Sequence, residues 1–231
     1  MNKTGQCCNI HTKKNLECKI MAKISKGKCE MIAINIVPLN TINIVAYRPP
    51  KTNGEDFNHI LNKIEDILSN MTKPEPTVIL TGDFNFPFVK WKVNSYNGCI
   101  SEIETNNNES KDEKTQFMRL CSIKNQYNMI QAINGTTREE NGKKSTLDLI
   151  YTNDISLFTE IEITPSNMSD HHLIEVSTSY HNTTNSEAPN KEKEKGMRIY
   201  NFYSKEIVWD EVNKQIEMVT WEENRKKTKK L

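Results

Sequence analysis

The sequence predicts an α/β fold on three observations. Short β-prone apolar runs alternate with segments in which apolar residues recur at helical spacing. The chain has 231 residues, which suffices for one large domain, or one domain with a short appendage, and for a sizeable core. Polar motifs stand at or beside three apolar runs, at residues 81–85, 145–150 and 169–172. Because strand ends can bring such motifs to one edge of a sheet, a shared active site is expected there.

Each expected element rests on its own local pattern. Apolar, β-prone runs bounded by turn residues predict strands over 17–24, 31–37, 41–47, 77–80, 129–133, 147–151 and 173–177. The strands at 31–37 and 41–47 should pair antiparallel across the turn Pro38-Leu39-Asn40. Apolar residues at helical spacing predict helices over Glu55–Asn70, Thr115–Asn128 and Ser204–Glu223. The Asn-rich segment 92–114 shows no periodicity and is expected to form a loop.

Shifts in composition divide the chain into three parts. Residues 1–180 are expected to form the α/β domain. Residues 181–198 are rich in Asn, Thr, Lys and Glu, which is typical of a linker. Residues 199–231 are expected to form a helical segment that ends in a basic tail.

The composition also excludes several classes of protein. With 31 basic and 30 acidic residues the net charge is +1, so any contact with nucleic acid must be local. The six cysteines form no C-x-x-C pair and no zinc-ligand spacing with histidine, so reduced or incidental thiols are expected. The sequence shows no apolar stretch of about 18 residues and no apolar leader, which predicts an intracellular protein without a membrane partner.

The first motif, Thr-Gly-Asp-Phe-Asn at residues 81–85, follows the apolar run at 77–80. If the chain stays extended, Asp83 and Asn85 point the same way. The carboxylate could then hold water or a metal ion while the amide donates to a phosphate oxygen. A plain turn is the alternative reading, because Gly, Asp and Asn are common turn residues.

The other two motifs supply a second acid and an imidazole. Asp148 interrupts an otherwise apolar strand, and a buried carboxylate needs a partner such as histidine. His171 opens the last strand beside Asp170, so it is a candidate general acid or base next to a carboxylate that could bind metal. Exposure on a strand edge and a polar turn are the respective alternatives. Together the three motifs supply the groups that a metal-dependent phosphodiesterase needs.

The order and spacing of these motifs resemble the endonuclease/exonuclease/phosphatase superfamily, most closely the endonuclease domain of non-LTR (LINE-like) retrotransposons. The resemblance covers residues 17–180 and includes the segment Tyr-Arg-Pro-Pro at 47–50. It implies a four-layer α/β sandwich in which helices flank two packed mixed sheets. It also implies hydrolysis of DNA phosphodiester bonds with Mg²⁺ or Mn²⁺ and no small-molecule cofactor.

The resemblance assigns catalytic roles position by position. Asp83 would position the attacking water, Asn85 would stabilise charge on the phosphorus centre, and Tyr47 would donate to the scissile phosphate. Asp148 would orient His171. Which group removes the proton from water stays open.

The resemblance also assigns binding roles and partners. Asp170 and Asp83 would lie at the metal, and Thr137 would join Asn85 in contacting phosphate. The segment Arg198–Trp221 resembles the region that leads from such an endonuclease toward a reverse transcriptase, which would be the partner domain in a complete element. A domain of this kind acting on genomic DNA would work in the nucleus.

One departure from the family pattern concerns the start of the domain. The family places an Asn-bearing strand and a strand with a metal-binding Glu well upstream of the segment that contains Tyr47, and too few residues precede Tyr47 to hold both. We therefore expect an N-terminally truncated domain that binds metal weakly and nicks DNA feebly or not at all. Two other functions remain open, namely a phosphatase or phospholipase of the same superfamily and a catalytically inactive remnant that binds nucleic acid.

Overall fold

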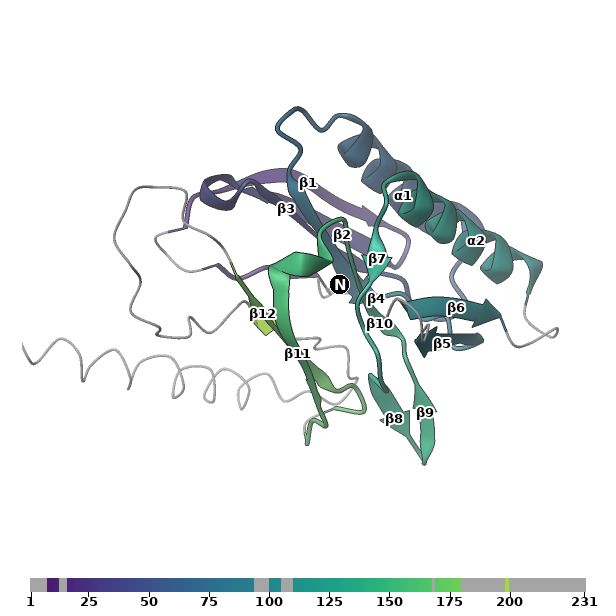
Figure 1. The fold of residues 1–231 in the computed structure, drawn as a ribbon. Helices are drawn as coiled ribbons and strands as arrows, with labels where there is room; N and C mark the ends of the chain where they lie inside the picture. Colours follow the sequence, from purple (N-terminus) through teal and green to yellow (C-terminus); the bar gives the residue numbers. More distant parts are fainter. Residues whose placement is uncertain are drawn as a thin grey trace, which may run out of the picture.

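The computed structural model describes residues 8–12, 16–93, 100–104, 110–167, 169–179 and 198–199. Its largest unit is a six-stranded sheet (Figure 1). In spatial order the strands are β1 (Cys18–Lys26), β2 (Cys29–Ile36), β3 (Thr41–Tyr47), β4 (Thr77–Asp83), β10 (Asp148–Thr152) and β7 (Ile130–Gln131). The β3–β4 pair is parallel and the other neighbours are antiparallel, so the sheet is mixed. A short 3-10 turn, η1 (Val37–Leu39), joins β2 to β3.

Two helices, α1 (Gly54–Ser69) and α2 (Lys111–Gln126), lie together on one side of this sheet (Figure 1). The side chain of Asn53 caps α1 by accepting from the backbone N–H of Glu55. Ser110 caps α2 in the same way through the N–H of Glu113. Both caps satisfy donors that a helix start leaves without a partner.

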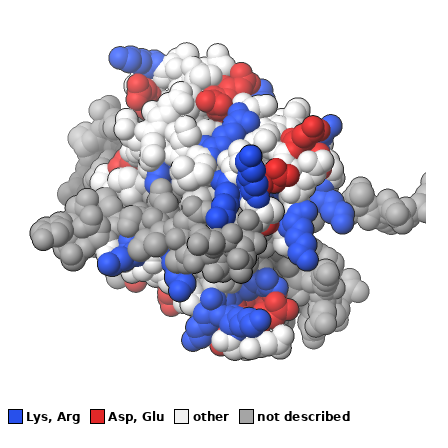
Figure 2. All heavy atoms as spheres, turned by 90° about the vertical axis from the view of Figure 1, so that its right-hand side faces the viewer, with Lys and Arg blue, Asp and Glu red and all other residues white. Residues whose placement is uncertain are grey.

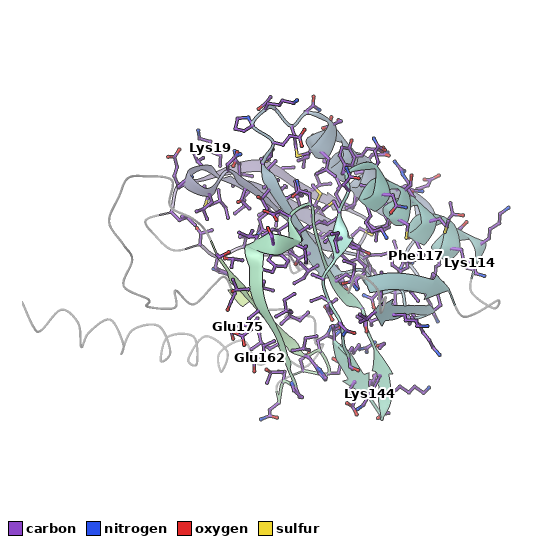
Figure 3. All side chains as sticks on the ribbon, in the orientation of Figure 1. Lys19, Lys114, Phe117, Lys144, Glu162 and Glu175 are labelled. Atoms are coloured by element: carbon purple, nitrogen blue, oxygen red, sulfur yellow. The ribbon has the colours of Figure 1, made fainter. Side chains whose placement is uncertain are left out.

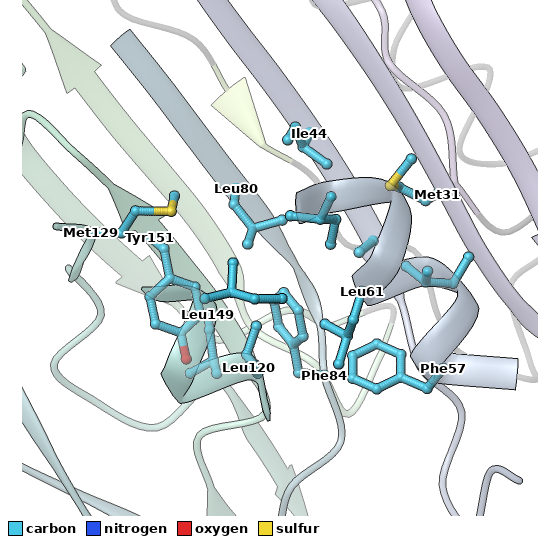
Figure 4. Packing of buried hydrophobic residues seen from close by; sticks show 14 of the residues in the cluster. Met31, Ile44, Phe57, Leu61, Leu80, Phe84, Leu120, Met129, Leu149 and Tyr151 are labelled. Carbon is cyan, nitrogen blue, oxygen red and sulfur yellow. The ribbon is translucent and has the colours of Figure 1, made fainter. Parts of the chain in front are cut away.

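The main core fills the space between the two helices and the sheet (Figure 4). Its centre is aromatic, with Phe86 packed edge-on against Phe57 at 6.1 Å and against Phe117 at 5.2 Å between ring centroids. Each fully buried side chain of this kind contributes about 1.5–3 kcal/mol. The core therefore holds the strand ends of β3 and β4 against α1 and α2.

A second sheet packs on the opposite side of the main sheet. Its strands are β11 (Phe158–Thr164), β12 (Leu173–Thr178) and β13 (Arg198–Ile199), all antiparallel, and the 3-10 turn η2 (Ile155–Leu157) precedes β11. A smaller apolar cluster, which includes Ile79 of β4, Ile150 of β10 and Val176 of β12, joins the two sheets. The fold is thus an α/β sandwich, as predicted, in which the described residues build one helical layer and two sheet layers.

Two hairpins complete the described structure, β5–β6 (Val89–Val93 and Ile100–Glu104) and β8–β9 (Arg138–Glu140 and Lys143–Ser145). The β8–β9 hairpin turns at Asn141 and Gly142, with φ of +50° and +75°. Positive φ at both turn positions is what a two-residue hairpin turn of type I′ requires. This hairpin projects beyond the sheets, near the turn between β11 and β12 (Figure 1).

Most of the expected strands and the first helix are confirmed, with β2, β3 and α1 within two residues of their predicted bounds and β4 three residues longer than predicted. The expected loop at 92–114 is wrong in part, because residues 100–104 pair with β5 and α2 begins at Lys111. The β8–β9 hairpin and β11 were not expected. Arg198–Ile199 form a strand where the sequence suggested the boundary between linker and helix, whereas the rest of the predicted linker and the helix at Ser204–Glu223 lie outside the described residues.

Two further observations bear on the sequence analysis. In the described part of the chain, neither helix has the length and apolar character that a bilayer-spanning segment needs. The four described cysteines, Cys8, Cys18, Cys29 and Cys121, are free thiols, and Cys7 and Cys99 lie outside the described residues. Burial raises the pKa of the Cys29 thiol to about 11, so this cysteine is a packing residue rather than a nucleophile.

Candidate active site

A row of polar side chains crosses the main sheet at the level where β3 and β4 end. Tyr47 of β3 lies opposite Asp83 of β4, and Asp83 lies opposite Asp148 of β10. Glu30 of β2 continues the row beyond Tyr47. Directly paired residues project to the same face of a sheet. Because Ile150, two residues after Asp148, packs toward the second sheet, the row faces that sheet rather than the helices.

His171 reaches this row from the second sheet, where it lies two residues before β12. Its Nδ1 is 2.8 Å from Oδ2 of Asp148, and both side chains are only 4% exposed. The backbone N–H of His171 donates to the hydroxyl of Ser169 at 3.0 Å, which fixes the chain just before the ring. Asp148 and His171 thus form the pair that the sequence analysis expected.

Asp83 completes a cluster with this pair. One potential ligand atom from each of Asp83, Asp148 and His171 lies within 4.8 Å of the other two, and all three residues are buried. Burial raises the pKa of Asp83 well above its usual range, and the charge of Asp148 adds to this effect. His171 and the hydrogen bonds of Asn85 oppose the rise only in part. Two neighbouring carboxylates are therefore costly to keep charged in the absence of a cation.

The carboxylate oxygens fit a hard divalent cation. Oδ1 of Asp148 is buried without a hydrogen-bond partner. The carboxylate of Asp83 lies on the neighbouring strand, directly opposite Asp148. Mg²⁺ binds such oxygens and usually takes only one or two carboxylates, with water or substrate phosphate completing its shell. Asp83 and Asp148 would hold such an ion. With so few protein ligands, we expect weak binding in the absence of substrate.

The same charges predict how stability depends on pH. For His171, burial lowers the pKa, but the bond to Asp148 and the charges of Asp148, Asp83 and Asp170 raise it overall. Asp83 and His171 thus keep their protons to higher pH in the folded chain than in the unfolded chain, where they titrate near 3.8 and 6.5. Because the folded state binds more protons, the free energy of unfolding falls as pH rises.

We expect the melting temperature in chelator to fall as pH rises above 3.8 and 6.5, the values at which Asp83 and His171 titrate in the unfolded chain. The stabilisation that His171 contributes to the folded state is complete below pH 6.5 and is lost as pH rises through the pKa of His171 in the folded chain. Thermal denaturation at a series of pH values measures this, and Asp83→Asn is the comparison because it removes one of the two groups. A slope that is identical in the wild type and the variant would contradict the role given to Asp83.

Asn85 lies close to Asp83 but not in the way the sequence suggested. The chain does not stay extended, because Asn85 has a left-handed backbone with φ of +49°. Its backbone N–H donates to Oδ1 of Asp83 at 3.2 Å, and its side-chain Nδ2 donates to the carbonyl of Arg48 at 2.8 Å. The assumption of an extended chain is therefore wrong, and the proposed contact of Asn85 with phosphate remains a prediction.

Thr137 supports Asp148 from the neighbouring loop. Its hydroxyl accepts from the backbone N–H groups of Leu147 at 2.9 Å and Asp148 at 3.0 Å. Its carbonyl accepts from the N–H of His172 at 2.7 Å, so Thr137 links the Asp148 strand to the His171 segment. The side chain is fully buried, which makes it a positioning residue in this structure. The predicted contact with phosphate remains untested.

Replacement of Thr137 by valine is expected to lower the free energy of unfolding by about 2–4 kcal/mol, because two buried N–H groups lose their acceptor. Chemical denaturation measures the effect. Thr136→Val is the matched control, because Thr136 is only partly buried. Equal effects of the two substitutions would contradict the role of Thr137.

Asp170 has a partner that the sequence did not suggest. Its Oδ2 is 2.5 Å from Nε of Arg138, and its carbonyl accepts from the N–H of Glu139 at 2.9 Å. Partial burial raises the pKa of Asp170, but the bond and charge of Arg138 outweigh this and lower it overall. Asp170 lies outside the ligand cluster of the described residues, so its role beside a metal stays a prediction. It ties the β8–β9 hairpin to the His171 segment.

The structure thus brings together Tyr47, Asp83, Asn85, Asp148 and His171, and places Thr137 and Asp170 as supports around them. Sequence reasoning missed two arginines at the site. Arg138 was seen only as part of the segment that contains Thr137, and Arg48 only as part of the segment that contains Tyr47. Arg138 contacts Asp170, and Arg48 contacts Asn85. Both contacts join residues far apart in the sequence, so no local sequence pattern predicts them.

Comparison with solved structures gives matches of low sequence identity. The endonuclease domain of TRAS1, a telomere-specific non-LTR retrotransposon, matches with a TM-score of 0.42 and 11% identity over 69% of this chain and 65% of that chain. A 3′ phosphatase from Neisseria bound to a product DNA hairpin matches with a TM-score of 0.41 and 13% identity over 65% of each chain. A mannosyl-6-phosphatase from Bacteroides thetaiotaomicron matches with a TM-score of 0.36 and 13% identity over 73% of this chain and 69% of that chain.

The chain therefore spans about two thirds of the length of the solved structures that it matches. Among curated proteins, none matches it. The family model described as endonuclease-reverse transcriptase matches residues 41–175, which is more than half of the chain and includes every predicted site residue. The chain accordingly belongs to the endonuclease-reverse transcriptase family of the endonuclease/exonuclease/phosphatase superfamily.

Proposed function

We propose that this chain is a divalent-metal-dependent endonuclease domain that hydrolyses phosphodiester bonds of DNA. The observation that carries the proposal is the buried cluster of Asp83, Asp148 and His171, in which a hydrogen-bonded acid and imidazole lie beside a second carboxylate. The description of the family as endonuclease-reverse transcriptase supports DNA as the substrate. On this proposal the natural partner is a reverse transcriptase, and the site of action is genomic DNA in the nucleus.

The residues divide the work according to their contacts. Asp148 accepts from Nδ1 of His171, which fixes the tautomer and leaves Nε2 to exchange a proton with water or the phosphate. Asp83 lies beside this pair and would orient the attacking water. Tyr47, next to Asp83 in the row, would donate its hydroxyl to a phosphate oxygen. A bound divalent cation would neutralise charge on the phosphoryl oxygens.

Charged side chains around the site favour nucleic acid over a small phosphate ester. The β8–β9 hairpin carries the exposed Lys143 and Lys144 and is tied to the His171 segment through Arg138. On the face shown in Figure 2, lysine and arginine side chains are interspersed with aspartate and glutamate side chains. Lys144 lies at the hairpin, whereas Glu162 and Glu175 lie on the second sheet (Figure 3). Local lysines of this kind supply contacts to the phosphates on either side of a cleaved bond.

The test is nicking of supercoiled DNA by the 231-residue chain in Mg²⁺ or Mn²⁺, with chelator as the control. The expected result is metal-dependent nicking, slow because the site has few metal ligands, that weakens in the double variant Lys143→Ala/Lys144→Ala. An oligonucleotide with a 3′-phosphate and a sugar phosphate are offered in parallel. Release of phosphate from either, without nicking, would favour a phosphatase. No turnover with any substrate would favour a binding remnant.

A further inference from the structure

Arg48 is a charged side chain buried directly behind the candidate site. It follows β3 by one residue and is among the largest side chains that are completely buried. Its guanidinium lies 4.4 Å from the ring centroid of Phe86 and 5.8 Å from that of Phe57, which places it on the helical side of the sheet. Asp83 and Asp148 project to the other side. A buried guanidinium is costly unless its donors are satisfied.

One nitrogen of the Arg48 guanidinium donates hydrogen bonds to the turn that follows Asp83. Its Nη1 donates to the carbonyl oxygens of Phe84 at 3.3 Å and Asn85 at 2.8 Å. In return, Nδ2 of Asn85 donates to the carbonyl of Arg48 at 2.8 Å, and the backbone N–H of Arg48 donates to the carbonyl of Asp83 at 2.9 Å. The two segments are thus bonded in both directions.

Helix α2 holds the other side of the guanidinium. Nε donates to Oε1 of Gln116 at 2.8 Å, and Nη2 donates to Oε1 of Glu113 at 3.2 Å. Gln116 is fully buried, and the second carboxylate oxygen of Glu113 accepts from the cap residue Ser110. The position of α2 is therefore transmitted through Arg48 to the turn at Asn85.

This turn has a left-handed backbone at Asn85, a conformation that asparagine adopts more readily than other non-glycine residues. The hydrogen bonds around the residue, rather than backbone strain, therefore hold it in place. They are the bonds to Arg48 and the bond from the N–H of Asn85 to Asp83. Without these hydrogen bonds, no other hydrogen bond observed among the described residues would hold Asn85 beside the carboxylate of Asp83.

We infer that Arg48 is a positioning residue, which couples α2 to the turn that carries Asp83 and Asn85 and so fixes the part of the site that faces phosphate. The inference rests on the proposed function in that it assumes a phosphate at this turn. It adds a residue that makes no contact with substrate, and it assigns α2 a role in the site beyond covering the sheet.

The test uses Arg48→Lys, which keeps the charge but cannot form the fork of hydrogen bonds. Ile64→Val is the matched control, since Ile64 is fully buried in the same core but lies two turns along α1 from Phe57. Hydrogen exchange of the Asn85 backbone amide reports the turn directly. We expect about tenfold faster exchange or more in Arg48→Lys, because hydrogen bonds to a charged group are lost. The control should leave this rate unchanged.

The kinetics of DNA nicking distinguish a positioning role of Arg48 from a purely structural one. If Arg48 positions the turn, kcat should fall about tenfold in Arg48→Lys while KM changes little, because no substrate contact is removed. Ile64→Val should leave both constants unchanged at a temperature where it is folded. A rise in KM with kcat unchanged would overturn the inference.

Three further outcomes complete the test. If Arg48→Lys does not fold, Gln116→Met removes one anchor only, and it should still speed exchange at Asn85. Unchanged exchange at Asn85 in either folded variant overturns the inference. If the wild-type chain nicks no DNA in any divalent metal, the proposed function fails for this chain, whereas the exchange measurements still decide the role of Arg48.

Discussion

Replacement of His171 by glutamine is expected to reduce metal-dependent nicking of DNA by about 10²–10⁴-fold, which is the usual contribution of a general acid or base. Glutamine keeps a polar group near Asp148 but cannot exchange a proton at Nε2. Because His171 is buried and bonded to Asp148 at 2.8 Å, the loss should appear mainly in kcat. Rates of plasmid nicking at saturating DNA measure it.

The neighbouring histidine supplies the control for this prediction. His172 follows in sequence, and its backbone N–H donates to the carbonyl of Thr137. Its ring is not part of the ligand cluster found among the described residues. His172→Gln should keep nearly full activity. Comparable losses in both variants would show that the segment tolerates no substitution and would remove the support for His171 as the acid or base.

Replacement of Asp83 by asparagine is expected to raise the melting temperature in chelator and to abolish stabilisation by metal. The variant removes a carboxylate whose pKa is raised in the wild type by its burial and, in addition, by repulsion from Asp148. It keeps an oxygen that can accept from the N–H of Asn85, so the turn should survive. The same variant should lose nicking activity, because the orientation of water and the hold on the cation are both impaired.

Metal titrations followed by thermal denaturation measure this effect. At about 100 times its dissociation constant, a ligand adds about 2.7 kcal/mol, or roughly 5–10 °C for a chain of this size. In the wild type the shift should begin only at millimolar rather than micromolar Mg²⁺ or Mn²⁺. Saturation at micromolar metal would contradict weak binding. A full shift in Asp83→Asn would contradict the assignment of the site.

Several features could be predicted from the sequence because they depend on local patterns. The helix at α1 follows from apolar residues at helical spacing, and β4 follows from an apolar run bounded by Pro76 and Gly82. The pairing of Asp148 with histidine follows from the cost of a buried carboxylate, which holds wherever the partner comes from. The alternating residues of β11 are also a local strand signal, although the strand was not expected.

Other features depend on which strands and helices become neighbours. The residues 100–104 show no clear strand pattern, and their partner β5 decides their structure. The turn at Asn85 depends on Arg48, which is 37 residues away, and Arg48 in turn depends on Gln116, which is 68 residues away. Asp170 is bonded to Arg138, and only the position of the β8–β9 hairpin brings these two residues together.

The sequence by itself thus determined the fold class, the groups available for chemistry and the acid–imidazole pair. Tertiary structure alone decided how these groups are oriented and supported. The physical reason is that burial and periodicity act within a segment, whereas a hydrogen bond to a guanidinium, a hydroxyl or a carboxylate depends on angles and distances of a few tenths of an ångström between distant segments. In this protein those bonds converge on Arg48, Thr137 and Arg138, whose roles no local pattern reveals.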